Sequence, residues 1–204
     1  QYMNIYVISL KESIERRDVF NKLNKKYIEY EYFDAIKGSD EHLSDSLIIK
    51  EDAVNFSKAA IGCALSHLNL WKLCVKLNKP IVIMEDDAFV SSLFNSYLDT
   101  VIKMLPTNFD ILQLCYNCDS ILGFSNTNFE TAYTFFSRKR FNDNDIDIFQ
   151  KRKIYPTIAR LHTSFGTGCY VITPKGASIL IKNCFPLDNR ELSLPLIGKL
   201  KSYT

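Results

Sequence analysis

Three consecutive acids, Glu85-Asp86-Asp87, follow directly after an apolar run at residues 81–84. Adjacent carboxylates repel one another and resist leaving water, so an unpaired cluster beside a core is costly. A divalent cation would relieve that cost, and hard oxygen ligands suit Mg²⁺ or Mn²⁺. A turn whose carboxylates cap the next helix is the simpler alternative. The triplet by itself supports a metal bound near a phosphate group and nothing finer.

The apolar run before the acids predicts where they lie in the fold. Residues 81–84 are apolar at every position, which is typical of a strand buried on both faces of a parallel sheet. Open α/β sheets bind ligands at the carboxyl ends of such strands. We therefore expect the triplet at the ligand-binding edge of an α/β sheet.

The rest of the chain alternates strand-like and helix-like segments, which indicates one α/β core. Besides 81–84, the expected strands are residues 5–10, 30–35, 109–114 and 168–172. The expected helices are residues 14–27, 59–77, 92–105 and 174–182. Residues 39–57 are interpreted as a surface loop with a short helix, and residues 117–160 as a long functional or mobile connection without clear periodicity. We expect a mostly parallel sheet flanked by helices, in a single domain over residues 3–204.

Composition excludes several classes of protein. The 204 residues carry a net charge of +2, too balanced for a nucleic-acid-binding protein, and 47% are hydrophobic, as in a globular domain. Neither a signal peptide nor an apolar run of transmembrane length is recognisable, so we expect a cytoplasmic protein. Basic residues cluster at 22–26, 138–140 and 151–153, and we interpret these clusters as solvent-exposed surface. The more specific alternative is peripheral contact with anionic lipid, at the inner face of a bacterial inner membrane.

The six cysteines lie mostly in apolar segments, which suits reduced, buried thiols. Cys115-x-x-Cys118 has the spacing of a zinc or redox pair. No second pair of cysteines or histidines accompanies it, so a structural role is favoured.

Three classes of protein place acids after a buried strand. A receiver domain has its acid pair at the first strand, and a phosphatase of the haloacid dehalogenase type needs Asp-x-Asp followed by Thr. Here the triplet comes later and Ala-Phe-Val follows it at residues 88–90. The Gly-x-Gly-x-x-Gly and P-loop patterns are absent from the sequence. A nucleotide-sugar transferase has a short acidic motif that holds a metal, which neutralises the departing nucleoside diphosphate. This class fits the position of the triplet, deep in the chain after a nucleotide-binding half.

Further motifs accompany the triplet in a fixed order. They are Ile8-Ser9-Leu10 with Glu15-Arg16-Arg17, Phe33-Asp34-Ala35 with Gly38, Ile61-Gly62-Cys63-Ala64-Leu65-Ser66-His67 with Trp71, Gly168 to Ile172 with Lys175-Gly176-Ala177, and Pro186-Leu187-Asp188. This order and spacing resembles glycosyltransferase family 25, which includes bacterial lipooligosaccharide galactosyltransferases and, more distantly, collagen galactosyltransferases. The resemblance covers nearly the whole chain and is weakest over residues 117–160.

The resemblance implies a GT-A fold, with a nucleotide-binding half over about 3–90 and an acceptor-side half over about 91–204. It implies a UDP-sugar donor, most often UDP-galactose, Mn²⁺ or Mg²⁺ as cofactor, and inversion to a β-linkage. The acceptor would be a lipooligosaccharide-type glycolipid or oligosaccharide. A metal-dependent phosphatase and a noncatalytic nucleotide-sugar or carbohydrate-binding module remain the alternatives.

The resemblance also implies roles for single residues. Asp87 would be the direct metal ligand, Glu85 would lie toward the metal or the ribose, and Asp188 would be the base that deprotonates the acceptor, with Asp110 and Asp119 as weaker rivals. The residues expected to contact the donor are Ser9, Leu10, Arg16, Phe33, Asp34, Ala35, Ser66, His67, Glu85 and Asp86. For Phe33, Ser66 and His67 a purely structural role is the alternative.

Two features depart from the family pattern. Members often carry a Glu just before the Gly-Cys pair, where this chain has Ala60-Ile61. The family also usually continues well beyond the Pro-x-Asp segment, whereas this sequence ends at Thr204.

Overall fold

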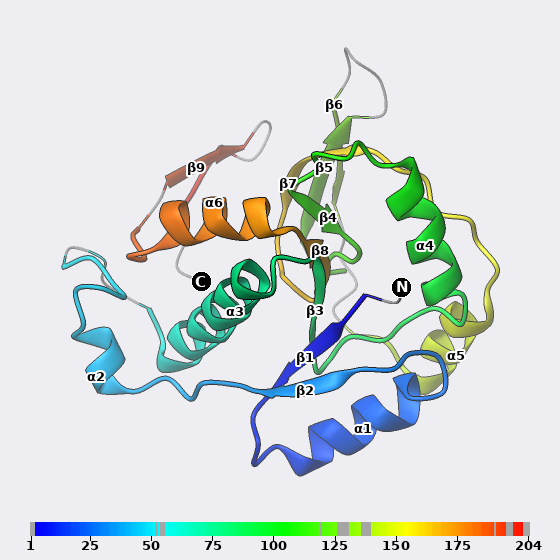
Figure 1. Ribbon diagram of the computed structural model, residues 1–204, viewed down its shortest axis with the longest axis horizontal. Coiled ribbons are helices and arrows are strands. Elements are labelled where there is room, and N and C mark those ends of the chain that lie inside the picture. Colours follow the sequence, from blue (N-terminus) through cyan, green and yellow to red (C-terminus); the bar gives the residue numbers. More distant parts are fainter. Residues whose placement is uncertain are drawn as a thin grey trace.

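A computed structural model describes residues 3–51, 53, 56–118, 120–125, 131–135, 140–189, 191–194 and 198–201. Its centre is a five-stranded sheet in the order β2-β1-β3-β8-β4 (Figure 1). These strands are β1 (Ile5–Ser9), β2 (Glu31–Asp34), β3 (Ile81–Glu85), β4 (Ile111–Gln113) and β8 (Cys169–Ile172). The predicted α/β class and all five strands are confirmed.

The sheet is mixed, because β8 runs against its neighbours. β1 pairs in parallel with β2 and β3, whereas β8 pairs antiparallel with both β3 and β4. The chain enters β8 at the carboxyl edge of β3, where Glu85 donates its backbone N–H to the carbonyl of Gly168 at 2.9 Å. A strand that starts at this edge must run antiparallel to β3, so the expectation of a mostly parallel sheet holds for four of the five strands.

Helices cover both faces of the sheet. Ile81 and Ile83 pack under α3 (Lys58–Leu77) and α6 (Pro174–Cys184), which lie side by side in Figure 1. Val82 and Met84 pack on the opposite face, toward α1 (Ile14–Asn24) and α4 (Phe94–Met104). All four strand residues are at most 1% exposed, which explains their uninterrupted apolar run.

The helix boundaries follow local capping chemistry. The Ser57 hydroxyl accepts the N–H of Ala60 at the start of α3, and Asn78 ends that helix in the left-handed conformation with φ 49°. Thr173 caps α6, which begins with Pro174 as predicted. The short helix expected in residues 39–57 is α2 (Asp40–Leu43).

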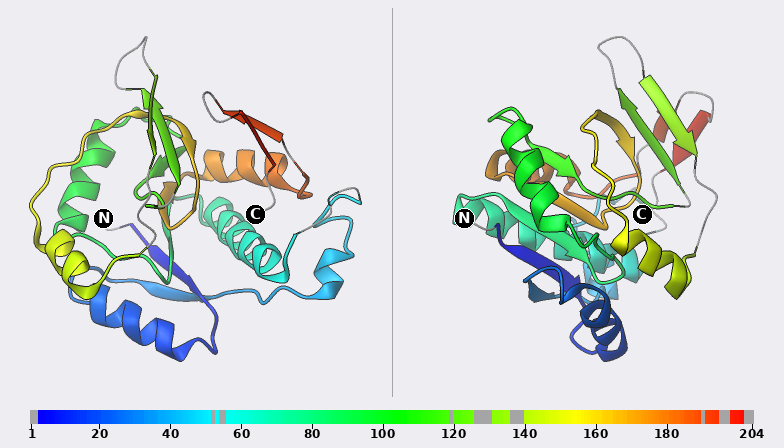
Figure 2. Two further views of the ribbon diagram at one scale, coloured as in Figure 1. Left: turned by 180° about the vertical axis from the view of Figure 1, so that it is seen from behind. Right: turned by 90° about the vertical axis from the view of Figure 1, so that its right-hand side faces the viewer.

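The interpretation of residues 117–160 as one long connection is wrong, because regular elements interrupt it. This part of the chain contains β5 (Ile121–Ser125), β6 (Thr131–Phe135) and α5 (Asp143–Lys151). Together with β7 (Arg160–Ser164), the strands form an antiparallel sheet in the order β6-β5-β7, which projects at one end of the molecule in Figure 2. Most of its residues are half-buried, so no clean alternation marks them in the sequence. A hairpin of β9 (Glu191–Leu194) and β10 (Gly198–Lys201) follows α6.

Two glycines bring the loop after β2 onto the start of α3. A Cβ atom on Gly62 would lie 2.4 Å from the carbonyl oxygen of Ile36, and one on Gly38 would lie 1.8 Å from the carbonyl oxygen of Lys58. Neither position accepts a side chain without moving the backbone. Gly38 and Gly62 are therefore required for packing at this point. In the part of the chain that the structure describes, no helix is long and apolar enough to cross a bilayer.

Candidate functional site

Three neighbouring strands end in polar residues at one edge of the sheet. β1 ends at Ser9, β2 at Asp34 and β3 at Glu85, and the parallel register places Ser9 opposite Asp34 and Ile8 opposite Glu85. The acid triplet therefore lies at the carboxyl edge, where a ligand of an open α/β sheet is expected. The first turn of α1 begins just after β1 and supplies the cationic groups of this edge.

Asp86 is held by two neighbours. The Ser9 hydroxyl donates to its Oδ2 at 2.7 Å, and the Nε of Arg16 donates to its Oδ1 at 2.8 Å. A second nitrogen of the Arg16 guanidinium contacts the same oxygen, and this hydrogen bonding raises the pKa of Arg16. Since the Asp86 side chain is 8% exposed and its oxygens are occupied, it fixes Arg16 at the rim of the site.

Glu85 points toward α3. Its Oε1 accepts a hydrogen bond from the Thr167 hydroxyl and lies 3.4 Å from the Nε2 of His67. Burial alone would raise the pKa of Glu85, but the interactions with His67 and Thr167 outweigh it and the pKa is lowered. Glu85 is therefore a carboxylate at neutral pH.

Asp87 is the least neutralised acid of the triplet. Its side chain is 67% exposed, and its contact with Arg16 is long, at 3.6 Å. Partial desolvation and the neighbouring charge of Glu85 raise the pKa of Asp87. The carboxylate thus projects to solvent with its charge largely uncompensated, which is the state that a bound cation stabilises.

Arg17 forms a second cationic anchor. Its Nη2 donates to Asp34 Oδ1 at 2.6 Å and to the carbonyl of Ser9 at 2.8 Å. The guanidinium carbon lies 4.5 Å from the centroid of the Tyr32 ring. Both adjacent arginines are therefore engaged at the carboxyl edge. Tyr32 lies two positions before Asp34, the last residue of β2, and this aromatic residue near an acid is the sequence signal that could have indicated the contact.

Ser66 is buried beneath the site. Its hydroxyl donates to the carbonyl of Gly62 at 2.7 Å and accepts the N–H of Ile36 at 2.8 Å. Because the residue has no exposed surface, it ties α3 to the loop after β2. Its side chain is not brought to the surface where a donor would lie.

His67 connects the core to Glu85. Its Nδ1 lies 2.7 Å from the hydroxyl of Tyr170, which also accepts the indole N–H of Trp71 at 2.8 Å. Burial raises the pKa of Tyr170, so its side chain is a neutral phenol. Tyr170 was not predicted as a site residue, because it appears in the sequence as one more member of an apolar strand.

The three remaining donor candidates lie at the same edge in half-buried positions. Ala35 donates its N–H to the carbonyl of Ser9 at 2.9 Å, and Leu10 accepts the N–H of Ser13 at 3.0 Å. Phe33 and Ala35 both pack against the core beneath α3, as the structural alternative for Phe33 expected.

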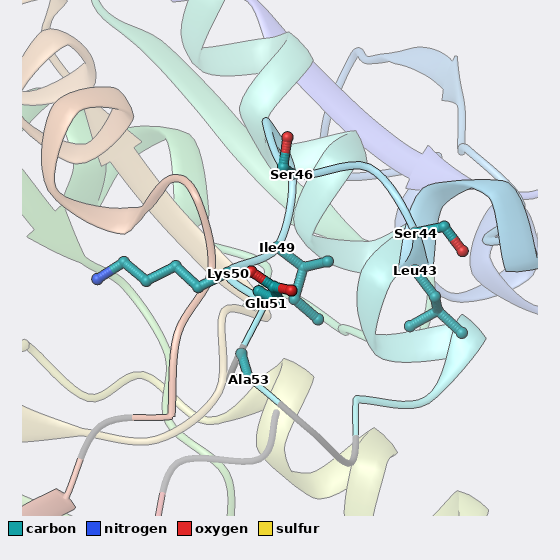
Figure 3. Close-up of a pocket in the computed structure, with 7 residues that line it drawn as sticks. All are labelled: Leu43, Ser44, Ser46, Ile49, Lys50, Glu51 and Ala53. Atoms are coloured by element: carbon teal, nitrogen blue, oxygen red, sulfur yellow. The ribbon is translucent and has the colours of Figure 1, made fainter.

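Asp188 lies against a different segment. Its Oδ2 is 2.8 Å from the Nζ of Lys50, and Lys50 donates its backbone N–H to the carbonyl of Leu187 at 2.8 Å. A surface hollow of about 480 Å³ adjoins Lys50, whose side chain extends away from the other lining residues in Figure 3. The rival base Asp110 precedes β4 and pairs with Lys175 near the start of α6, at the opposite edge of the sheet. Asp119 lies outside the described residues.

The sequence profile of glycosyltransferase family 25, described as LPS biosynthesis proteins, matches residues 3–190. The chain belongs to this family. A candidate glycosyltransferase of Haemophilus influenzae strain Rd is 28% identical over 191 residues, which cover 87% of this chain and 56% of that protein. The lipooligosaccharide biosynthesis protein lic2B of Haemophilus influenzae is 33% identical over 100 residues, covering 46% of this chain and 36% of that protein. A glycosyltransferase 25 family member of Aedes aegypti is 32% identical over 96 residues, covering 41% of this chain and 16% of that protein.

The chain thus spans about half, or less, of the length of these curated relatives. In this member of glycosyltransferase family 25 the acid triplet fits a hard divalent metal. Asp87 and Glu85 offer ionised oxygens, and Asp87 is exposed and weakly paired. Asp86 fits less well, because Ser9 and Arg16 already occupy its oxygens.

Proposed function

We propose that the chain is a metal-dependent, inverting glycosyltransferase of GT-A type that uses a nucleoside-diphosphate sugar. One observation carries this proposal: the acid triplet and two guanidinium groups held by ion pairs lie at the same edge of the sheet. Within the triplet, Asp87 has the carboxylate that projects to solvent and is only weakly paired. Membership of glycosyltransferase family 25 supports glycosyl transfer. The pattern suits a diphosphate, which needs both a metal and cationic groups to carry the charge that develops on the leaving group.

Each group has its own part in this proposal. A Mn²⁺ or Mg²⁺ ion, held by Asp87 with Glu85, would supply positive charge to the departing diphosphate. Arg16 remains fixed by Asp86 at the rim, where its exposed face can bind a phosphate oxygen. Arg17 holds Asp34 and the end of β1 in place, which keeps the edge rigid for the donor.

The donor we propose is UDP-galactose, with the uracil near the end of β2 at Phe33 to Ala35. Support for the hexose comes from the family alone. The acceptor we propose is a lipooligosaccharide-type glycan, because the relative lic2B is a lipooligosaccharide biosynthesis protein. Such an acceptor is assembled on lipid, so we place the protein in the cytoplasm, in peripheral contact with anionic membrane. The exposed basic residues Lys151, Arg152 and Lys153 are suited to that contact.

Asp188 remains our proposal for the base that takes the proton from the acceptor hydroxyl. Its Oδ2 lies 2.8 Å from the Nζ of Lys50, and this ion pair holds the carboxylate in a defined position. Asp188→Asn should abolish transfer while leaving donor binding intact. Loss of donor binding in this variant would contradict the assignment.

The proposal is tested by thermal unfolding of the full chain with UDP and Mn²⁺ together. The unfolding temperature should rise, because ligands that bind the native state stabilise it. Asp87→Asn should abolish the rise, whereas Asp99→Asn, on the exposed face of α4, should keep it. No rise with UDP or any UDP-sugar in the presence of Mn²⁺ would overturn the proposal.

Product analysis separates the two alternatives. Release of UDP from UDP-galactose, with sugar appearing on a lipooligosaccharide acceptor, is expected of a transferase. Donor binding without turnover would instead indicate a binding module. Release of phosphate from simple monoesters would indicate a phosphatase.

A further inference from the structure

Three potential metal ligands of different chemistry converge beside the acid triplet. Cys63 and His67 are one helical turn apart on α3, so both side chains lie on the same face of the helix. Glu85 approaches them from the end of β3. The thiol, an imidazole nitrogen and a carboxylate oxygen all lie within 4.8 Å of one another.

His67 supplies a second, independent indication of a ligand. Its side chain is 5% exposed, and its Nε2 is a buried atom without a hydrogen-bond partner among the described residues. The nearest candidate, Glu85 Oε1 at 3.4 Å, lies too far away for a good hydrogen bond. A buried polar atom that lacks a partner is costly, and a metal ion in this position would supply one.

We propose that Cys63, His67 and Glu85 form a binding site for a transition-metal ion of the Zn²⁺ class. Thiolate and imidazole are ligands that select Zn²⁺ or Co²⁺ and that Mg²⁺ and Mn²⁺ do not prefer. Three protein ligands leave a fourth position open, toward the side on which Cys63 is exposed. This site goes beyond the proposed transferase function, and the two share Glu85.

Loading the site requires small changes that the chain can make. Zinc–ligand bonds of about 2.0–2.3 Å place tetrahedral ligand atoms roughly 3.3–3.8 Å apart, so the three atoms, now within 4.8 Å of one another, must close by up to about 1.5 Å. Cys63 is the exposed member and can turn about its Cα–Cβ bond. The thiol proton leaves to solvent as the metal–sulfur bond forms. The imidazole then carries its hydrogen on Nδ1 and donates it to the Tyr170 hydroxyl through the 2.7 Å contact.

Neighbouring groups already orient two of the ligands. Tyr170 holds the Nδ1 side of His67, which is how ligating histidines are usually positioned by outer groups. Thr167 donates to Glu85 Oε1 and leaves the second carboxylate oxygen available. Burial, together with the negative charges of Glu85 and Asp87, raises the pKa of Cys63 to about 11. The same two charges attract a cation to this point.

The test is a titration of the reduced full chain with Co²⁺, a spectroscopic substitute for Zn²⁺. We expect the intense near-ultraviolet charge-transfer absorption of a cobalt–thiolate bond, which Zn²⁺ should then displace. Cys63→Ser should lose this absorption. Cys184→Ser, which changes another helical cysteine on α6, should keep it. Affinity for Zn²⁺, measured by competition with a chromogenic chelator, should fall at least about tenfold in His67→Gln.

The outcomes separate this proposal from the transferase proposal. Asp87→Asn should remove the stabilisation by UDP and Mn²⁺ but leave the cobalt–thiolate absorption, and Cys63→Ser should do the reverse. Absence of the absorption in the unmodified chain would overturn the metal site. Its persistence in Cys63→Ser would also overturn the site, because the thiolate would then belong to another cysteine.

Discussion

Arg16 and Asp86, which are 70 residues apart in the sequence, form a hydrogen-bonded ion pair at the carboxyl edge of the sheet. The pair joins the first turn of α1 to the acid triplet. Because the Asp86 side chain is 8% exposed and the Arg16 side chain is 56% exposed, the carboxylate is the structural partner and the guanidinium faces solvent. Asp86 therefore orients the Arg16 guanidinium, while the neighbouring Asp87 carboxylate projects to solvent.

Arg16→Ala should destabilise the protein by about 1–2 kcal/mol, because it leaves a mostly buried carboxylate with Ser9 as its remaining partner. The effect is below that of a fully buried ion pair, since Arg16 is more than half exposed. Urea denaturation at neutral pH measures it. Lys22→Ala, on the last turn of the same helix, is the matched control and should change stability by less than about 0.5 kcal/mol. Equal effects of the two substitutions would show that the Asp86 pair is not a stabilising contact.

The sequence predicted the position of the triplet because local pattern and burial agree there. Ile81 to Met84 are apolar at each position and at most 1% exposed in the structure. The sequence pattern therefore predicts the strand, its burial on both faces and the acids at its carboxyl end. The direction of β8 is not visible in this way. A fully buried strand has the same pattern whether it runs parallel or antiparallel, and its direction depends on where the chain arrives.

The missed site residues share a related cause. Tyr170 lies in a run of otherwise apolar strand residues, and only the fold shows that its hydroxyl meets His67 and Trp71 from α3. Arg17 on α1 donates a hydrogen bond to Asp34 on β2, and these two residues are 17 positions apart in the sequence. Long-range hydrogen bonds of this kind leave no periodic signal, whereas a capping residue such as Thr173 acts on its immediate neighbours and marks the helix start locally.

Tyr170→Phe should cost about 2 kcal/mol of stability. The substitution removes the hydroxyl that serves both the indole N–H of Trp71 and the Nδ1 of His67, and it leaves these buried groups without a partner. The matched control is Tyr97→Phe, because the Tyr97 hydroxyl is buried without a hydrogen-bond partner within the described part of the chain. That control should be neutral or slightly stabilising in the same thermal or urea unfolding measurement. A loss in Tyr97→Phe as large as in Tyr170→Phe would contradict the bridging role of the Tyr170 hydroxyl.

Asp87→Asn should make the metal-free protein more stable at neutral pH, although it removes the proposed metal ligand. The pKa of Asp87 is raised from 3.8 in the folded chain, so ionisation of this acid disfavours the native state. Its contribution to stability is fully present below pH 3.8 and is lost as the pH rises through the higher folded-state pKa. The gain from Asn should therefore be absent in acid, develop as the pH rises from 3.8 through the folded-state pKa, and be complete above it.

Glu85 titrates in the opposite sense and complicates a single measurement. Its pKa is lowered from 4.5, so its contribution is present above pH 4.5 and is lost as the pH falls through the lower folded-state value. The Glu85 contribution is common to Asp87→Asn and the unmodified chain, so the difference in stability between the two at each pH removes it as far as the two acids do not interact. The measurement is the unfolding temperature between pH 3 and pH 7 in the absence of divalent metal. The series starts at about pH 3 because this lies below the ordinary pKa values of both Asp and Glu side chains. A variant that is less stable than the unmodified chain at pH 7 would show that Asp87 is already compensated by its protein neighbours, which would remove the electrostatic reason for a metal at this carboxylate.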